Sequence, residues 1–503
     1  MECGALDVSP AVSSPYSSML KKLLLFGCIA FAVLSFMILN RPAWKLNDFD
    51  QPFYVTIAYD LDKYGVFSNG PFAPVDSTIA RPPPGMFFGP VYPILVLAAM
   101  KLDARFAAAV QCSVEADRGH RDETSCEAYA VPMRLINACL LVIGLIAIAC
   151  AAELIVRRKS TFLVAGLLVL AGLAAEADIF SYVMTESAIF AIYSVFALHM
   201  LLAWKTGQTK YFLFGGGLLG LLCLTKPSFL ILFPGIAALS LLYGYRLSKE
   251  PQPHTGRRVL GFSMAFAIVV GLWTGRNAIS VGKFGLTEEY GAAALIERFA
   301  YDDMTARELL QAFPYCMPGV GGLAFDQVSG TDSMHRFVYH TSGSFFNVGR
   351  DRRNTLVREH QRLDPIIGAI VLDEMRTRWW RYLLVSIPLA WCGMWAGSLI
   401  SLLLIPAFAL ACVRVLMRGQ PLLLLYAAPA MSMLPLYATV GNHYTRYNLI
   451  LIGPYAVGAA LMVTSWWYRW KIRCGDQKLR SRAAVCRSLV ADRHVFMSCD
   501  GTP

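Results

Sequence analysis

Ten long apolar segments recur along this chain, and they constrain its fold more than any other feature of the sequence. About 17 to 25 apolar residues in a helix are enough to cross roughly 30 Å of hydrocarbon. The pattern therefore predicts an all-α integral membrane protein with about ten transmembrane helices. The segments lie near residues 20–39, 132–156, 161–179, 184–204, 211–225, 227–245, 258–278, 396–416, 421–440 and 448–468.

The composition supports a membrane location and disfavours several soluble classes of protein. Of the 503 residues, 56% are hydrophobic and 16% are charged, and the mean hydropathy is +0.49. Soluble domains carry about a quarter charged residues, so this chain lacks the polar surface that a water-exposed globule needs. The net charge of +11 does not indicate a nucleic-acid partner, because Lys and Arg occur in short clusters between the apolar segments.

The positions of these basic clusters predict the orientation of the chain, since Lys and Arg are enriched in short cytoplasmic loops. With ten spans all clusters fall on one side, which predicts that both termini are cytoplasmic. The first segment is expected to remain as an uncleaved span, because no small-x-small cleavage site follows it. The two long loops, 40–131 and 279–395, then lie on the opposite face. The clusters are Lys21-Lys22, Arg157-Arg158-Lys159, Lys205 with Lys210, Arg246 to Arg258, Arg414 with Arg418, and the tail after Arg469.

Two further apolar stretches, 86–100 and 379–395, are short, and each contains a proline. Their aromatic residues favour interfacial helices that lie along the outer surface. The two segments that meet at Thr225-Lys226-Pro227 are compatible with two short spans or with one long broken helix.

The 13 cysteines carry little information, because most lie inside apolar segments, where Cys acts as a small apolar residue. Cys112 and Cys126 share the first long loop and can form a disulfide in an oxidising compartment. No CxxC or His/Cys spacing predicts a metal site, and no cofactor is expected.

Charged residues beside or within apolar spans are energetically costly and therefore mark candidate functional sites. Asp48 and Asp50 directly follow the first span, and the residues from Tyr54 to Leu61 continue with helical apolar spacing. These carboxylates at the water boundary are candidates for chemistry. The alternative is that Asp50, before Pro52, is a plain helix cap.

Glu186 and Lys226 are the next candidates along the chain. Glu186 follows Thr185 in the short outer turn between the third and fourth spans, where helix capping is again the alternative. Lys226 lies between two apolar segments. It can extend to the surface as an anchor, or it can hold a phosphate as a point charge.

Two further polar motifs lie at outer span ends. Arg276, in Trp273-Thr274-Gly275-Arg276-Asn277, closes the seventh span, and His443, Arg446 and Tyr447 lie in the last outer turn. Arg446 and Tyr447 can alternatively belong to an aromatic and basic belt, and a lone His443 is more often structural.

The predicted topology brings all these sites to one face at one depth, although they are separated by about four hundred residues of sequence. Cations there can bind an anionic phosphate, and a carboxylate can take a proton from an attacking hydroxyl. No P-loop, dinucleotide-binding glycine pattern or GxSxG motif competes with this interpretation.

The order of these features resembles the multi-spanning polyprenyl-phosphate-dependent glycosyltransferases of the GT-C type. That family includes protein O-mannosyltransferases, lipid A aminoarabinose transferases and rhizobial galacturonic acid transferases. The resemblance covers roughly residues 20–290 and 420–460. It rests on Asp50 with Tyr54, Pro82-Pro83-Pro84-Gly85 through Pro90-Val91-Tyr92-Pro93, Arg134-Leu135, Thr185-Glu186, Leu224-Thr225-Lys226-Pro227, Arg276-Asn277 with Gly282, and Arg446-Tyr447 before Pro454.

The resemblance implies a GT-C-type helical bundle in a bacterial inner membrane, with interfacial helices and a periplasmic active site. It implies a polyprenyl-phosphate-linked sugar donor, a lipid, glycan or protein acceptor, and inversion at the anomeric carbon. The implied organisation is a catalytic module over 1–278 that includes the first periplasmic loop 40–131, a periplasmic loop region over 279–395, C-terminal transmembrane helices over 396–470, and a cytoplasmic tail over 471–503.

The resemblance also implies residue roles. Asp50 would be the general base, a role worth about 10²–10⁴ in rate, with Asp48 and Glu186 as further catalytic candidates. The implied donor-phosphate ligands are Lys226, Arg276, Arg81 and Arg446, and the implied substrate contacts are Tyr54, His443 and Tyr447. Ala80-Arg81 stands where aminoarabinose-type enzymes have Glu-Lys, so a divalent metal is not indicated.

Two other classes of protein stay open at this stage. A lipid-linked glycan transporter or flippase would place ionisable residues near the bilayer midplane on broken helices, and the Lys226-Pro227 junction is the feature that favours it. An O-antigen polymerase or ligase would use Arg and His in the late loop, where this chain has Arg350 to Arg353, His335, His340 and His360.

Overall fold

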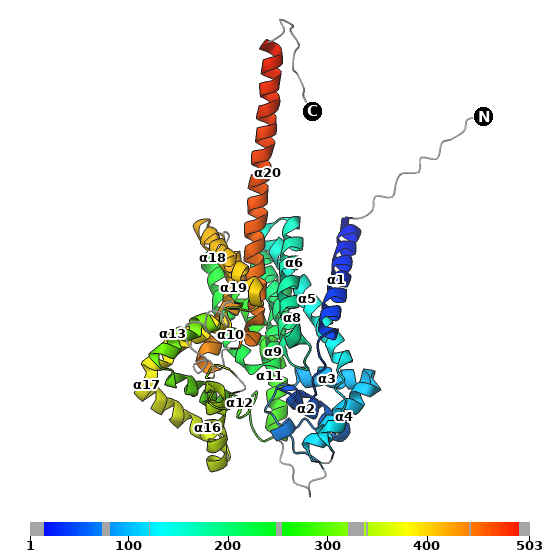
Figure 1. The fold of residues 1–503 in the computed structure, drawn as a ribbon, viewed down its shortest axis with the longest axis vertical. Coiled ribbons are helices and arrows are strands. Elements are labelled where there is room, and N and C mark those ends of the chain that lie inside the picture. The colour runs from blue at the N-terminus through cyan, green and yellow to red at the C-terminus, as the bar shows by residue number, and fades with distance from the viewer. Residues whose placement is uncertain are drawn as a thin grey trace, which may run out of the picture.

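The computed structural model describes residues 15–72, 81–119, 121–247, 254–319, 336–338, 341–441 and 444–491. Over these residues the chain is helical and contains no β-strand (Figure 1). The all-α, multi-span architecture expected from the sequence is therefore confirmed.

All ten predicted apolar segments fold as helices. Seven helical stretches within the described residues are long and apolar enough to cross a membrane: Val131–Val156 (α5), Glu186–Thr206 (α8), Pro227–Arg246 (which contains α10, Leu232–Leu242), Thr255–Ser280 (α11), Ser398–Met417 (which contains α18, Ser401–Met417), Leu422–Val440 (α19) and Thr445–Ile472 (the apolar start of α20, Ile452–Ala491). The other three segments form shorter apolar helices: Leu23–Leu39 within α1 (Pro15–Leu39), Lys159–Ala175 (α6) and Thr209–Thr225 (α9).

The long helices run side by side, and the loop elements gather at one end of the bundle. In Figure 1 the helices α2, α3, α4, α12 and α16 lie at the lower end, whereas the start of α1 and the C-terminal part of α20 lie at the upper end. This arrangement agrees with the predicted even number of spans and with long loops opposite the chain ends. Which end faces the cytoplasm stays a prediction.

The junction at Lys226 is a reversal between two helices. Ile231, near the start of α10, lines the same cavity as Asp50, whereas Tyr243, at the end of that helix, lines a cavity beside the last residues of α5. Since α9 begins just after α8 ends, α9 and α10 run in opposite directions. The interpretation as one long broken helix is therefore wrong, and Lys226 lies at the end of the bundle where α8 begins.

Close packing around α9 depends on small residues, as is common between membrane helices. A Cβ atom at Gly216 would lie 2.1 Å from the carbonyl oxygen of Phe262 in α11, and one at Gly220 would lie 2.8 Å from Val269. Larger residues would push α9 and α11 apart. This contact helps to fix the position of the Lys226 reversal.

The first long loop folds into Gln51–Tyr64 (α2), Val91–Leu102 (α3) and Ala104–Asp117 (α4). Cys112 and Cys126 form the disulfide that their shared loop allowed, with Cα atoms 5.6 Å apart. The fully buried Asp60 accepts hydrogen bonds from Arg118 at 2.7 and 2.9 Å and from Ser68 at 2.6 Å. The ion pair satisfies the buried carboxylate, although burial still raises the pKa of Asp60.

The late loop forms Tyr290–Phe299 (α12), Ala306–Tyr315 (α13), Phe345–His360 (α16) and Asp364–Gly393 (α17). The predicted interfacial helix over 379–395 is not separate, because it continues α17 beyond a break in helical backbone geometry at Arg378. A second disulfide, Cys316–Cys392, joins the end of α13 to α17 with Cα atoms 4.9 Å apart. Sequence analysis did not anticipate this pair, because 76 residues separate its members.

Candidate functional site

A cavity of about 980 Å³ opens at the loop end of the bundle, and we name it the Asp50 cavity. Its walls come from the start of α2, the α9–α10 reversal, α12, α16 and the last outer turn. A small recess adjoins it, and the two share Asp50, Tyr54, Phe87, Phe88, Lys226, Pro227, Tyr290 and Tyr447. Glu186 lines the recess. The structure therefore brings Asp50, Glu186 and Lys226 to one hollow, although they lie on three separate helix ends.

Arg446 lies between the two carboxylates of the site. Its Nη2 donates to Asp50 Oδ2 at 2.6 Å, and its Nε lies 3.9 Å from Glu186 Oε1. Asp50 precedes α2, but its side chain makes no capping hydrogen bond, so the capping interpretation is wrong for this residue. Its carboxylate is 40% exposed and faces the cavity that it lines. The Asp50 carboxylate is thus oriented by a cation and open to a substrate.

Glu186 is the first residue of α8 and is almost fully buried. Its Oε2 atom is buried without a hydrogen-bond partner among the described residues. A buried carboxylate oxygen without a donor is unfavourable, so this atom is placed to accept a hydrogen bond from a bound ligand.

A network of amide and guanidinium donors holds the turn that carries Glu186. Arg134 donates to the carbonyl oxygens of Ser181, Arg41 and Pro42 at 2.6–3.1 Å. Asn137 donates at 3.0 Å to two further carbonyls of the turn and accepts at 2.6 Å from the hydroxyl of Ser187. Arg134, which contributed to the sequence resemblance, therefore has a structural role, since its three hydrogen bonds within the described residues all go to backbone carbonyls.

Gln51 couples this turn to the start of α2. Its side-chain oxygen accepts from the backbone N–H of Val183 at 2.9 Å, and its amide nitrogen donates to the carbonyl of Lys45 at 2.9 Å. Because Gln51 neighbours Asp50 and Val183 precedes Glu186 by three residues, one side chain fixes the relative positions of the two acids.

Lys226 lies between α9 and α10 with only 8% of its surface exposed. Its extended backbone follows from Pro227, which disfavours helical geometry in the residue before it. The ammonium lies 3.4 Å from the ring centroid of Tyr447 and 5.0 Å from that of Tyr437. Burial lowers the pKa of Lys226 to about 7, against the raising effects of Glu186 and Asp50.

The proline-rich segment within the first long loop packs directly against this reversal. A Cβ atom at Gly89 would lie 1.9 Å from the carbonyl oxygen of Leu224, so only glycine permits the approach. The contact lets Phe87 and Phe88 form a wall of the cavity beside Lys226. The same wall buries the phenol of Tyr54, and this burial, with the charges of Asp50 and Glu186, raises the pKa of Tyr54 well above its usual value.

Several candidates from the sequence do not line the cavity. Arg276 donates to the carbonyl oxygens of Gly85 and Phe67 at 2.6 and 3.0 Å, so it holds the proline-rich segment in place. Asp48 accepts from the backbone N–H of Lys45 at 3.0 Å. Arg81 is exposed and is not among the lining residues of either hollow. His443, together with His335 and His340, lies outside the described residues.

The structure adds residues from the late loop to the site. Arg350 and Arg353 of α16, with Glu297 and Tyr290 of α12, line the wall opposite α2. Arg353 is paired with Glu297, whereas the guanidinium of Arg350 lies 5.7 Å from the ring centroid of Phe346. The basic segment Arg350-Asp351-Arg352-Arg353 was the signal in the sequence, but its position relative to Asp50 depends on the fold of the whole loop.

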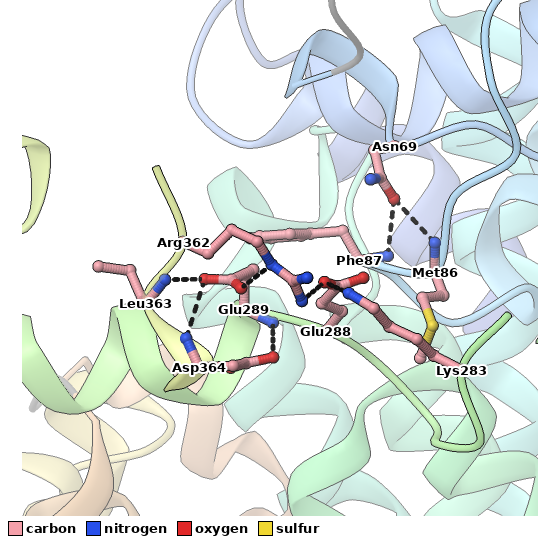
Figure 2. Close-up of polar contacts among 9 residues, drawn as sticks. All are labelled: Asn69, Met86, Phe87, Lys283, Glu288, Glu289, Arg362, Leu363 and Asp364. Atoms are coloured by element: carbon pink, nitrogen blue, oxygen red, sulfur yellow. Dashed lines mark hydrogen bonds and ion pairs between the residues drawn. The ribbon is translucent and has the colours of Figure 1, made fainter. Parts of the chain in front are cut away.

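A separate acidic cluster, Glu288, Glu289 and Asp364, lies beside the cavity (Figure 2). Glu288 pairs with Arg362 and Lys283, and Glu289 accepts from the backbone N–H of Asp364 at 3.2 Å. The Asp364 carboxylate accepts in turn from the backbone N–H of Glu289 at 3.0 Å. Cations and backbone donors already satisfy these carboxylates, so the cluster fastens the segment after α11 to the start of α17.

Figure 2 also shows two hydrogen bonds within the first loop, next to this cluster. Asn69 Oδ1 accepts from the backbone N–H groups of Met86 and Phe87 at 2.8 and 3.0 Å. The carbonyl of Met86 accepts from the backbone N–H of Glu288 at 3.3 Å. The first and late loops are thereby joined at the wall of the cavity that contains Phe87.

No family model matches the chain, and no curated protein matches its sequence. Among solved structures it is similar to the apo oligosaccharyltransferase of Archaeoglobus fulgidus, with 11% identity and a TM-score of 0.39 over 91% of this chain and 52% of that one. It is also similar to ArnT from Cupriavidus metallidurans bound to undecaprenyl phosphate, with 14% identity and a TM-score of 0.36 over 87% of this chain and 78% of that one. The chain thus spans about half the length of the oligosaccharyltransferase.

Proposed function

We propose that this protein transfers a sugar from a polyprenyl-phosphate donor to an acceptor hydroxyl in the Asp50 cavity. The observation that carries the proposal is the convergence of an exposed, cation-oriented carboxylate and a buried lysine in one hollow at the end of a membrane bundle. Glycosyl transfer from a lipid phosphate needs both groups, a base for the acceptor and a cation for the departing phosphate.

Asp50 is the proposed general base. Its Oδ2 is held by Arg446, and its other carboxylate oxygen makes no hydrogen bond within the part of the chain that the structure describes. That oxygen takes the proton from the acceptor hydroxyl as the hydroxyl oxygen bonds to the anomeric carbon. The bond from the anomeric carbon to the phosphate oxygen breaks, and its electron pair leaves with the polyprenyl phosphate. A single displacement inverts the anomeric configuration.

Lys226 is the proposed ligand of the donor phosphate. The phosphate departs as an anion, so it needs a cation more than an acid. The sequence suggested Arg446 for the same task, but its contact with Asp50 and its approach to Glu186 favour a positioning role for this residue. We assign Glu186 Oε2, buried and without a partner, to a hydroxyl of the donor sugar.

The wall formed by the start of α10 and the turn before it offers a path for the isoprenoid chain. Leu230, Ile231, Phe233 and Pro234 line this side of the cavity, and Leu230 and Ile231 are 44% and 52% exposed. Burying a lipid chain is worth about 0.8 kcal/mol per methylene, so the chain stays in the bilayer while its phosphate reaches Lys226. The acceptor then enters from the opposite wall, where α16 presents Arg350.

The test is transfer of labelled sugar from polyprenyl-phosphate donors to a cell-envelope extract by the purified protein. We expect label in the acceptor fraction, free polyprenyl phosphate in equal amount, and loss of both with Asp50→Asn. Asp62→Asn is the matched control, because Asp62 lies on the same helix but pairs with Lys101 outside the cavity. Full transfer by Asp50→Asn would refute the assigned base, and failure of every donor with the wild-type protein would refute the function.

A transporter receives less support than it did from the sequence. The feature that favoured transport was a broken helix at Lys226 near the bilayer midplane. The structure instead has a reversal between two helices at the loop end of the bundle.

A further inference from the structure

A second cavity, of about 580 Å³, lies at the opposite end of the bundle from Asp50. Helix α19 connects the two ends, since Leu422 and Leu423 line the second cavity whereas Tyr437 and Val440 line the first. At 1.5 Å per residue, the 19 residues of α19 span about 28 Å. That length is close to the thickness of the hydrocarbon core, so the second cavity lies at the other membrane boundary.

Five arginines line this cavity, and we name it the arginine cavity. They come from three helix ends that are distant in sequence: Arg157 and Arg158 after α5, Arg414 and Arg418 at the end of α18, and Arg469 on α20. No Asp or Glu is among the lining residues. Sequence analysis used these arginines only to orient the chain, whereas the structure gathers them around one hollow.

Arg414 has the least favourable position in this group. Its Nη1 is buried without a hydrogen-bond partner among the described residues. The positive charges of Arg418, Arg469 and Arg158 also repel the charge of Arg414. A buried cationic donor that faces other cations is unfavourable unless an anion satisfies it. The arrangement therefore predicts an anion close to Arg414.

Arg158 shows that the cluster is held in place. Its Nη1 donates to the carbonyl of Thr464 at 3.2 Å, and its guanidinium lies 4.4 Å from the ring centroid of Tyr468. Both contacts come from α20, so α5 and α20 together fix this side of the cavity. A fixed guanidinium loses less side-chain freedom when it binds a phosphate.

The apolar part of the cavity indicates which kind of anion fits. Val415, Leu422 and Leu461 are among its lining residues. On the adjoining surface of α18, Leu416 and Met417 are 64% and 79% exposed. A headgroup with acyl chains would place its phosphate among the arginines and its chains along this apolar surface. A free phosphate would leave the apolar part without a partner.

We propose that the arginine cavity binds the phosphate headgroup of an anionic membrane lipid. Basic pockets between transmembrane helices are suited to such headgroups, particularly to those with two phosphates. This site lies at the opposite boundary from the Asp50 cavity and takes no part in the proposed transfer. Its occupancy can therefore be tested without a sugar donor, and failure of either proposal leaves the other intact.

The test measures thermal stability and lipid affinity of the full-length protein in a neutral detergent. Cardiolipin should raise the melting temperature in a saturable way, whereas phosphatidylcholine and inorganic phosphate should not. Each arginine near a lipid headgroup contributes roughly fivefold to affinity, so Arg414→Gln with Arg418→Gln should weaken cardiolipin binding about thirtyfold.

The matched control is Arg257→Gln, which removes an exposed arginine at the start of α11 that does not line the cavity. It should bind cardiolipin as the wild type does. Gln420→Glu keeps all arginines and adds a carboxylate at an exposed lining position, so it tests the cavity if the double variant does not fold. Equal weakening by Arg257→Gln, unchanged binding by Gln420→Glu, or equal stabilisation by inorganic phosphate would overturn the proposal.

Discussion

The two cavities at opposite ends of the bundle differ in how their charges are balanced. In the Asp50 cavity, Arg446 lies within 4 Å of carboxylate oxygens from two acids, and Lys226 packs on Tyr447. In the arginine cavity, no carboxylate is among the lining residues. Neighbouring acids and cations can hold a base and a cation in defined positions for chemistry. A group of cations without carboxylates instead favours the binding of an anion.

The disulfides are also distributed unequally along the bundle. Both disulfides within the described residues, Cys112–Cys126 and Cys316–Cys392, lie in the loop elements at the Asp50 end. Free cysteines such as Cys28, Cys150 and Cys412 lie within the bundle helices. Disulfides persist in oxidising compartments, which agrees with the prediction from the sequence that the Asp50 end is periplasmic.

After Asp50 itself, the largest effect should come from Arg446, which lines the Asp50 cavity. Arg446→Gln removes the cation that orients Asp50, and a charge-assisted hydrogen bond of this kind is worth about 1.5–3 kcal/mol. We expect sugar transfer to fall roughly 10- to 150-fold, measured as kcat with saturating donor. Arg257→Gln, at the other end of the bundle, should change kcat less than twofold. Equal losses in the two variants would remove the functional distinction between the ends.

Removal of the Lys226 ammonium should raise the KM for the donor more than the KM for the acceptor. Lys226→Met keeps an unbranched side chain that is one heavy atom shorter, but it leaves the phosphate without its cation. We expect KM for the polyprenyl-phosphate sugar to rise about tenfold or more, while KM for the acceptor stays within twofold. Steady-state kinetics with each substrate varied in turn checks this, and a change confined to the acceptor would place Lys226 in the acceptor site.

The pH dependence of donor binding should reflect the protonation of Lys226. The pKa of Lys226 is lowered to about 7 by burial, so the ammonium is present below this pH and is lost as the pH rises through it. Donor affinity should therefore be constant below about pH 6 and should weaken by up to about tenfold per pH unit above 7. Lys226→Arg should abolish the dependence, because guanidinium stays charged. An unchanged profile in Lys226→Arg would assign the titration to another group.

The smallest effect on transfer should come from the disulfides. Cys112→Ser with Cys126→Ser removes a crosslink between residues 14 apart in sequence, which should lower the free energy of unfolding by about 2–4 kcal/mol. The rate of transfer at low temperature should change little, because neither cysteine lines the Asp50 cavity. Thermal unfolding and initial rates check the two effects. A loss of transfer without a loss of stability would show that the first loop has a direct role.

Much of the site was predictable, because charged residues beside apolar spans are rare and conspicuous. Asp50, Glu186, Lys226 and Arg446 were identified in this way, whereas Tyr54 and Tyr447 came from the family resemblance, and the structure brings all six together. Arg276 and Asp48 fit the same pattern, but their side chains bind backbone groups away from the cavity. A sequence pattern places a residue at a boundary without indicating the direction of its side chain.

The late loop was the least predictable part. Its cavity residues Glu297 and Arg353 pair across 56 residues, and the Cys316–Cys392 disulfide spans 76. The buried Arg298 donates to the carbonyl of Ala438 and to Asp302, both at 2.8 Å. It thereby joins the loop to the end of α19. Apart from the local Arg298–Asp302 pair, none of these contacts follows from periodicity or hydropathy, since each depends on how separate helices pack.

The amino-acid sequence by itself determined the helical, membrane-spanning character of this protein and the assignment of the long loops to one end. Those properties follow from the length of the apolar segments and from the positions of lysine and arginine, which act locally. Only the tertiary structure decided which side chains meet. The reversal at Lys226 and the approach of Gly89 to Leu224 created one cavity, and the ends of α5, α18 and α20 created the other. Both depend on contacts between distant helices, whose positions no short stretch of sequence specifies.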